Sequence, residues 1–338
     1  MRVFHADAHR AHHPRTEVVL GRQVPAFEVP ERADAILSAV SRSHPGATPP
    51  PAAREALGSV HEAAYLTHLE TAWGDWIAAG GDGALSADTF LLAGLGAAAE
   101  PASAEARMGR YTFDASTPIL EGTWEAALAA AGCALAAADT VAGGERAAYA
   151  LCRPPGHHAG RAFGGGYCYL NNAALAATRI GGRIAILDLD YHHGNGTQQI
   201  FWDDPDVLYV SLHADPDAEY PYYTGRRDET GGPGAAGATR NLPLPAGSGD
   251  AAYLEALDAA VEAVGAWGPA ALVVSLGTDA SQRDPMGRFD LTDACFSRMG
   301  ERAASLGLHT VVVQEGGYDL GSIGELVVRF LAPLSPRS

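Results

Sequence analysis

The 338-residue chain carries 40 acidic and 23 basic residues and has a formal net charge of −17. An acidic surface repels nucleic acids and anionic membranes and favours cationic ligands. No apolar stretch approaches the roughly 18 residues of a membrane helix. The N-terminus lacks a secretion-signal pattern and the four cysteines lack short paired spacing, so we expect reduced thiols in a cytoplasmic protein.

Apolar runs rich in β-branched residues alternate with stretches in which apolar residues recur at i, i+3 and i+4. In chain order these patterns predict a strand at 2–5, helices at 31–43, 61–79 and 122–141, a strand at 147–152, a helix at 171–180, strands at 183–190 and 207–213, a helix at 251–267, a strand at 271–277, a helix at 291–305, a strand at 310–317 and a helix at 321–332. Continuous apolar strands alternating with helices are typical of a parallel sheet covered on both faces. We therefore expect an α/β protein, a three-layer α/β/α fold with a mainly parallel central sheet.

No stretch has the composition of a flexible interdomain linker, so we expect a single domain over residues 1–338. The Gly- and Ala-rich segment 80–121 has weak periodicity and is expected to be an inserted loop. The Pro-rich segment 43–52 is expected to be a surface loop, and 214–240 a long loop of the kind that lines a site or mediates association.

Polar and reactive side chains follow four of the predicted strands directly. His157 and His158 follow the run at 147–152, and the sequence DLDYHHGN follows the next run. Asp279 and the sequence EGGY follow the last two runs. Because ligands of open parallel sheets lie at the carboxyl ends of the strands, we expect these residues to face one shared cleft.

The spacing of Asp188, Asp190 and His192 places all three on one side of an extended chain, since side chains alternate with period two. Carboxylate and imidazole groups are good zinc ligands, and Asp279 offers a third carboxylate. Such a set leaves a coordination position open for water or substrate, as catalytic sites do, whereas structural zinc sites use four ligands and are usually rich in cysteine.

Six ordered motifs, RPPGHHAG, GGGYCYLNNAA, DLDYHHGNGTQQIF, YVSLHADP, LGTDA and QEGGY, resemble the histone deacetylase superfamily of zinc amidohydrolases, in particular the bacterial acetylpolyamine amidohydrolases. The resemblance covers nearly the whole chain and implies the arginase/deacetylase-like fold. It also implies that Asp190, His192 and Asp279 are the ligands of one zinc ion, with ferrous iron as an alternative in the cell.

The resemblance implies roles for the residues around this centre. His158 matches the general base that takes a proton from water and later returns it to the departing amine, and His157 matches a neighbour that stabilises charge. Asp188 and Asn195 match the residues that orient His157 and His158, and Tyr318 matches the tyrosine that hydrogen-bonds the oxyanion. The implied tunnel residues are Gly166, Tyr167 and Tyr220, and the implied ligands of a structural potassium ion are Asp188, Asp190, His192, Ser211 and Leu212.

The expected function is removal of acetyl or similar small acyl groups from N-acetylated amines, with small cationic acetylpolyamines as substrates. An acetyl-lysine peptide deacetylase, a hydrolase of another small N-acyl amide and a non-catalytic binder of acetylated amines are the alternatives. The presence of His158 and Tyr318 favours an enzyme. A binuclear arginase-like enzyme would want a carboxylate where Ser281 stands, which favours one metal.

Substrate selectivity is expected to depend on acidic residues at the mouth of the tunnel. The family's polyamine- and peptide-processing members have an acidic residue in the loop before their EGTW-like motif, and an ungapped alignment puts Ser116 at that position. Glu105, Asp114 and Glu121 lie nearby in the sequence and are candidates to compensate. The resemblance further suggests that the insertion at 80–121 packs against a second subunit, so we expect a homodimer.

Overall fold

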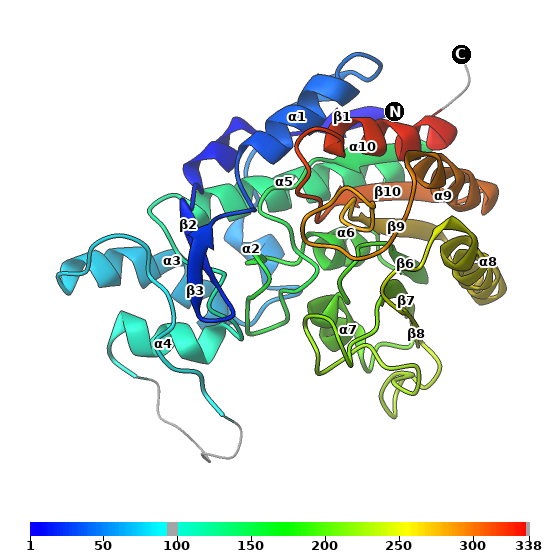
Figure 1. Cartoon of the computed structure of the whole chain (residues 1–338). Helices are drawn as coiled ribbons and strands as arrows, with labels where there is room; N and C mark the ends of the chain where they lie inside the picture. Colours follow the sequence, from blue (N-terminus) through cyan, green and yellow to red (C-terminus); the bar gives the residue numbers. More distant parts are fainter. Residues whose placement is uncertain (93–100, 336–338) are drawn as a thin grey trace.

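The computed structural model describes residues 1–92 and 101–335, which contain an eight-stranded parallel sheet (Figure 1). The order of its strands is β4-β1-β5-β10-β9-β6-β7-β8. Strands from both ends of the chain, β1 and β10, lie in this one sheet. The bounds are β1 Arg2–Phe4, β4 Gly46–Ala47, β5 Ala147–Ala150, β6 Ile184–Asp188, β7 Val207–Ala214, β8 Thr239–Leu244, β9 Ala271–Leu276 and β10 His309–Gln314. The predicted fold class is confirmed.

Helices cover both faces of the sheet, which explains why the central strands are apolar without alternation. One face packs against α1 (Glu31–Val40), α8 (Asp250–Trp267), α9 (Asp293–Ser305) and α10 (Ile323–Leu331). The other packs against α3 (Ala63–Ala78), α4 (Ala104–Tyr111), α5 (Thr123–Ala142), α6 (Asn172–Ile180) and α7 (Asn195–Phe201), with the one-turn helix α2 (Arg54–Leu57) alongside. Along β6, Ile184 and Ile186 belong to one core, whereas Ala185 and Leu187 belong to the other.

Several described elements were not predicted, among them α7, β8 and the four described next, and each is too short or too polar to show a period. Within the Pro-rich segment 43–52, which was predicted to be a loop, Gly46–Ala47 forms the edge strand β4 beside β1. The antiparallel hairpin of β2 (Thr16–Val19) and β3 (Arg22–Pro25) lies outside the main sheet. The helix α4 lies inside the predicted insertion 80–121, of which residues 93–100 are outside the described part.

The helix α5 corrects one expectation about apolar stretches. It is the one described helix that is long and apolar enough to span a membrane by length and composition, with a mean hydropathy of 1.3. However, 61% of the window is buried inside the protein, as in the central helix of a large core. All four cysteines are free and buried, as expected.

The crossing of α9 and α10 depends on the missing side chain of Gly300. A Cβ atom there would lie 2.1 Å from the backbone oxygen of Phe330, which cannot move without displacing α10. We expect Gly300→Ala to lower the free energy of unfolding by about 1–3 kcal/mol, the usual cost of overpacking a core. Denaturant unfolding followed by circular dichroism measures this change.

Gly265→Ala is the matched control, because this glycine also lies within a helix, α8. Its added Cβ would meet its nearest neighbour, Leu306 Cδ2, at 4.0 Å, which is ordinary van der Waals contact. Alanine has a higher helix propensity than glycine, so we expect stability to stay equal or rise by up to about 1 kcal/mol. Equal destabilisation by both substitutions would contradict the packing argument.

Candidate active site

The loops that follow β5, β10, β9 and β6 meet at the carboxyl edge of the sheet, where the sequence predicted a shared cleft. These four strands are consecutive neighbours in the sheet. The backbone N–H of Gly156 donates to Glu315 Oε2 at 2.7 Å, and that of Gly316 donates to Asp190 Oδ2 at 2.8 Å. Backbone N–H of Tyr191 donates to Asp279 Oδ1 at 3.1 Å. Each bond joins two loops that lie far apart in the sequence.

Asp190, His192 and Asp279 bring their donor atoms together at this edge. One ligand atom from each residue lies within 4.8 Å of the other two. Nδ1 of His192 lies 3.1 Å from Asp279 Oδ2 and 3.4 Å from Asp190 Oδ1. Two carboxylates and one imidazole at this separation fit a divalent metal ion that keeps a position open for a further ligand.

The charges of this cluster also fit a cation. Burial, together with the neighbouring Asp190, raises the pKa of the Asp279 carboxyl to about 7. Burial likewise opposes ionisation of Asp190, but the positive charge of His157 and the hydrogen bonds of His192 outweigh it and lower its pKa. Two buried carboxylates side by side repel each other, and a metal ion between them relieves that repulsion.

A second group, His157, Cys168 and Glu315, also has donor atoms within 4.8 Å of one another. Burial raises the pKa of the Cys168 thiol well above its usual value, which disfavours the thiolate that a metal requires. The carboxylate of Glu315 already accepts hydrogen bonds from the backbone N–H groups of Gly156 and His157. This group therefore supports the histidine loop and is a poor metal site.

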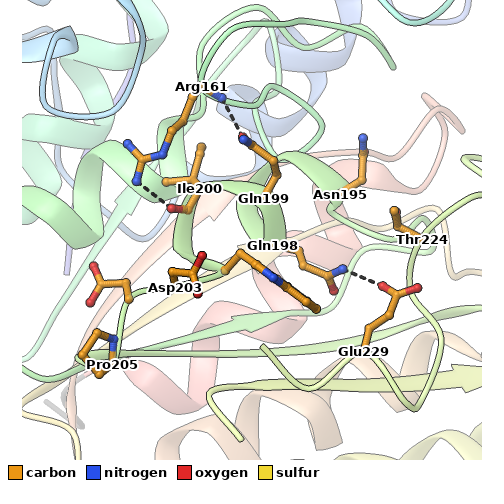
Figure 2. Close-up of a pocket in the computed structure, with 11 residues that line it drawn as sticks. Arg161, Asn195, Gln198, Gln199, Ile200, Asp203, Pro205, Thr224 and Glu229 are labelled. Atoms are coloured by element: carbon orange, nitrogen blue, oxygen red, sulfur yellow. Dashed lines mark hydrogen bonds between the residues drawn. The ribbon is translucent and has the colours of Figure 1, made fainter. Parts of the chain in front are cut away.

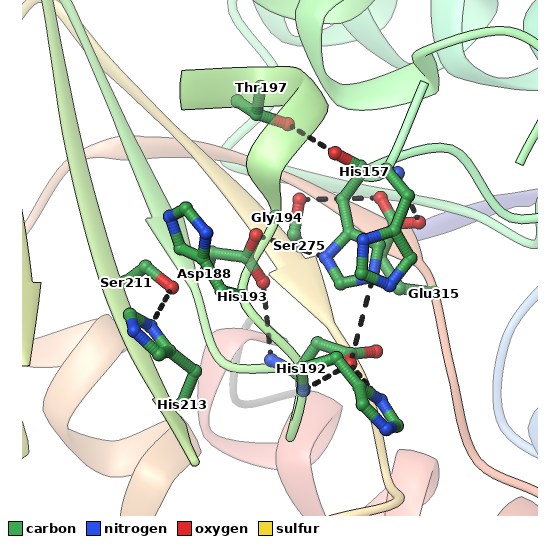
Figure 3. A network of polar contacts seen from close by, with 12 residues as sticks. His157, Asp188, His192, His193, Gly194, Thr197, Ser211, His213, Ser275 and Glu315 are labelled. Atoms are coloured by element: carbon green, nitrogen blue, oxygen red, sulfur yellow. Dashed lines mark hydrogen bonds and ion pairs between the residues drawn. The ribbon is translucent and has the colours of Figure 1, made fainter. Parts of the chain in front are cut away.

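His157 and Asp188 lie together in the polar network of Figure 3, 3.2 Å apart between Nδ1 and Oδ2. Burial opposes protonation of His157, but the charges of Asp190 and Asp188 overcome it and raise its pKa to about 10. This raised pKa favours the imidazolium form of His157, beside the group of Asp190, His192 and Asp279. Asp188 also accepts a hydrogen bond from the hydroxyl of Tyr209 at 3.0 Å.

His158 and Asn195 form a separate pair, with 2.7 Å between Nδ1 of the ring and Oδ1 of the amide. Burial, followed by the charges of His157 and His192, lowers the pKa of His158 well below its ordinary value. His158 is therefore neutral, and because the amide oxygen can only accept, Nδ1 carries the proton. The lone pair is left on Nε2, where it is available to accept a proton.

Tyr318 lies on the loop after β10 and is held from two directions. Its backbone N–H donates to Asp284 Oδ2 at 2.6 Å. The guanidinium of Arg32 lies 4.7 Å from the centroid of its ring, and Arg32 also donates to the backbone oxygens of Glu315 and Gly317. Neither Arg32 nor Asp284 was predicted as a site residue, since both are distant from Tyr318 in the sequence.

The predicted tunnel residues lie around these groups. Gly166 has φ 55°, and a Cβ there would lie 2.2 Å from Cδ2 of His158, so only glycine fits. Tyr167 packs edge-on against Tyr318, with 5.7 Å between ring centroids. Tyr220 packs edge-on against His158 at 5.3 Å and against His192 at 6.0 Å.

Sequence reasoning did not identify Phe113 as part of this aromatic wall and placed Asp114 only as a nearby acid. Phe113 stacks on Tyr220 with 5.9 Å between centroids. Asp114 Oδ2 accepts hydrogen bonds from the Tyr220 hydroxyl, the Gly166 N–H and the Ser116 hydroxyl. The position of YTFDAS before EGTW was the available signal. Ser116 thus contacts the acid beside it.

The remaining predicted residues are divided between two places. Register pairs Asp188 of β6 with Ser211 of β7, so Ser211 and Leu212 lie beside the Asp188–His192 loop. Ser211 Oγ and His213 Nδ1 are 2.7 Å apart. Glu105 lies in the first turn of α4, and one of its carboxylate oxygens is buried without a hydrogen-bond partner among the described residues.

Comparison with known proteins identifies the family of the chain. The model of the histone deacetylase domain matches residues 26–334. The chain is 45% identical to Acetylpolyamine amidohydrolase 1 of Pseudomonas aeruginosa over 97% of this chain and 96% of that protein, and 43% identical to the acetylpolyamine amidohydrolase of Mycoplana ramosa over 98% of each. A crystal structure of the acetylpolyamine aminohydrolase from Burkholderia pseudomallei superposes with a TM-score of 0.94 at 40% identity and covers 99% of this chain and 98% of that one. The chain therefore belongs to the histone deacetylase family and is an enzyme of the deacetylase class.

Proposed function

We propose that the chain hydrolyses the amide bond of N-acetylated linear amines, with acetylated di- and polyamines as its substrates. The observation that carries this proposal is the position of neutral His158 beside the cluster of Asp190, His192 and Asp279. The names of the relatives support the substrate class. A panel of acetylputrescine, acetylspermidine, acetyl-lysine peptides and neutral N-alkyl acetamides tests it by their relative kcat/KM values.

Asp190, His192 and Asp279 would hold a divalent ion, which we propose to be Zn²⁺, and this ion would polarise the amide carbonyl and lower the pKa of water at the site. Nε2 of His158 takes a proton from water as the water oxygen bonds to the carbonyl carbon. The same nitrogen gives that proton to the amine nitrogen as the C–N bond breaks, so that acetate and the free amine leave.

Tyr318 and His157 would stabilise the charge that develops during this reaction. The hydroxyl of Tyr318 donates a hydrogen bond to the carbonyl oxygen as it becomes an oxyanion. The imidazolium of His157 supplies a fixed positive charge nearby, and Asp188 and Asn195 keep the two histidines oriented. We also propose a structural potassium ion at Asp188, Asp190, His192, Ser211 and Leu212.

Asp114 is our candidate for the acidic group that recognises the cationic amine. Its Oδ2 accepts hydrogen bonds from both Tyr220 and Gly166. Its Oδ1 is buried and has no hydrogen-bond partner among the described residues. Glu17 contacts Tyr167, the second tyrosine of the proposed tunnel. Its Oε1 accepts a hydrogen bond from the Tyr167 hydroxyl at 3.0 Å. Burial raises the pKa of Glu17 to about 7, so the carboxylate of Asp114 is the one that we expect to hold an ammonium group by charge.

Asp114→Asn should weaken the use of cationic substrates, because it keeps an acceptor oxygen for Tyr220 and Gly166 but removes the charge. We expect kcat/KM to fall about tenfold for acetylputrescine, the size of one partly buried charge interaction, and little for a neutral N-alkyl acetamide of equal length. Raising the ionic strength should reduce the wild-type preference for the cation in the same direction. Equal losses for both substrates would argue against charge recognition.

We further propose that the chain forms a homodimer and is cytoplasmic. Five of the exposed large apolar side chains belong to the hairpin β2–β3, the end of α3 and the segment that follows it, namely Val18, Leu20, Ile77, Leu91 and Leu92. The hairpin and α3 lie on the same side of the molecule (Figure 1). Burial of such a patch by a second copy is favourable, so light scattering should report twice the chain mass at micromolar concentration. A monodisperse monomer would count against the dimer.

A further inference from the structure

A pocket of about 850 Å³ lies beside the active site, between α7 with the turn after it and the loop 224–229 (Figure 2). We call it the α7 pocket, and its lining residues used below are Arg161, Asn195, Trp202, Asp203, Asp204 and Glu229. Its volume is within the range of pockets that bind small organic molecules. Its lining includes neither the candidate metal ligands Asp190, His192 and Asp279 nor the two tyrosines Tyr220 and Tyr318.

The α7 pocket has a negative balance of charge. Three carboxylates, those of Asp203, Asp204 and Glu229, face one guanidinium, that of Arg161. Arg161 is already engaged, since its Nη atoms donate to the backbone oxygens of Val60 at 3.3 Å and Ile200 at 2.6 Å. Within residues 1–92 and 101–335 none of the three carboxylates forms an ion pair, so no cationic side chain compensates their charges. Asp203 Oδ1 accepts a hydrogen bond from the backbone N–H of Gly234 at 3.3 Å, and Asp204 Oδ1 accepts one from that of Asp206 at 3.0 Å.

Hydrogen bonds hold the carboxylate of Glu229 in a fixed position, so it is not a freely moving surface group. Its Oε2 accepts hydrogen bonds from Gln198 Nε2 at 2.6 Å and from the backbone N–H of Gly225 at 2.9 Å. Gln198 is itself buried, only 5% exposed, and its Oε1 accepts from Asn241 Nδ2 at 2.8 Å. A charge fixed in advance by a buried network loses little conformational entropy when it binds a ligand.

The composition of the pocket favours an organic cation over a bare metal ion. Asp203, Asp204 and Glu229 do not bring three donor atoms within 4.8 Å, which in the described part of the chain only the two groups at the active site do. Trp202 adds an indole to the wall, and indole faces attract ammonium groups. Separated carboxylates around an aromatic ring match a flexible chain that carries several separated positive charges.

We propose that the α7 pocket is a second binding site, distinct from the tunnel, for a linear alkylamine that carries two or more ammonium groups. The site adjoins the catalytic residues through Asn195, which lines the pocket while its Oδ1 accepts the hydrogen bond of His158. If the chain acts on acetylamines as proposed, the free amine that it releases belongs to the same class of ligand. The binding site itself does not depend on that activity.

Calorimetric titration of the metal-loaded protein with spermidine tests the proposal. The variant Asp203→Asn/Glu229→Gln keeps acceptor oxygens for Gln198 and Gly225 but removes two charges, so we expect it to lose one equivalent of spermidine or bind it at least tenfold more weakly. Asp206→Asn is the matched control, since this exposed acid lies in the same turn but outside the pocket, and it should bind as the wild type does. Unchanged thermal unfolding shows that each variant is folded.

Trp202 provides a second readout that is local to the pocket. Spermidine should change the tryptophan fluorescence of the wild type at the concentration where calorimetry detects the pocket, and Trp202→Phe should remove that change. The proposal is overturned if the double variant binds spermidine with wild-type stoichiometry and affinity, if octane-1,8-diol binds as tightly, or if Mg²⁺ alone reproduces the signal. Because all readouts are binding, a failure of the proposed deacetylation would leave this result unaffected.

Discussion

His158→Ala and Tyr318→Phe should each lower kcat by about 100-fold or more while the metal content stays unchanged. The reason differs between the two variants. Without His158 the site loses the imidazole that is placed to take the proton from water, because the pKa of neighbouring His157 is raised to about 10, which favours its protonated form. Without the Tyr318 hydroxyl the oxyanion loses a hydrogen-bond donor, and removing one such donor typically costs 10²–10³ in rate, or roughly 3–4 kcal/mol.

Steady-state kinetics on acetylputrescine, with metal analysis of the same samples, measures both effects. Tyr223→Phe is the control for Tyr318→Phe, since Tyr223 is 88% exposed and should give wild-type kinetics. A loss in kcat with little change in KM would indicate that each group acts mainly in the transition state. Turnover near the wild-type level in either variant would show that its role is wrongly assigned.

Asp279→Ala should remove the metal and with it essentially all activity. The wild type is expected to hold close to one equivalent of a divalent transition metal, and the variant close to none. The remaining pair, Asp190 and His192, offers one carboxylate and one imidazole, too few ligands to compete with water for the ion. Asp290→Asn is the control and should retain both metal and activity, because Asp290 also follows β9 in the sequence but is exposed.

Metal analysis by plasma spectrometry after dialysis checks this result, and added chelator should inactivate the wild type in parallel with metal loss. Two tightly bound transition-metal ions per chain would contradict a mononuclear centre. An Asp279→Ala protein that still holds one equivalent would show that the cluster is not the metal site. If the control variant Asp290→Asn kept its metal but lost activity, the result would indicate misfolding near β9.

The sequence by itself determined the layered fold and the core of the candidate site. Strands such as β6 and β9 are buried on both faces, so their apolar runs are unbroken and can be recognised in the sequence. Polar residues that end such runs must lie at the carboxyl edge of a parallel sheet. For that reason Asp190, His192 and Asp279 were placed together from their positions alone.

Only the tertiary structure decided which residues contact Tyr167 and Tyr220, the tyrosines of the proposed tunnel. Asp114 meets Tyr220 across 106 residues of sequence, and Glu17 meets Tyr167 across 150. Both acids come from segments without a regular period, the insertion 80–121 and the short hairpin β2–β3, so no local pattern marks their partners. The raised pKa of Asp279 and the lowered pKa of His158 likewise arise from burial and from neighbouring charges, which exist only once the loops of four strands have been brought to one edge.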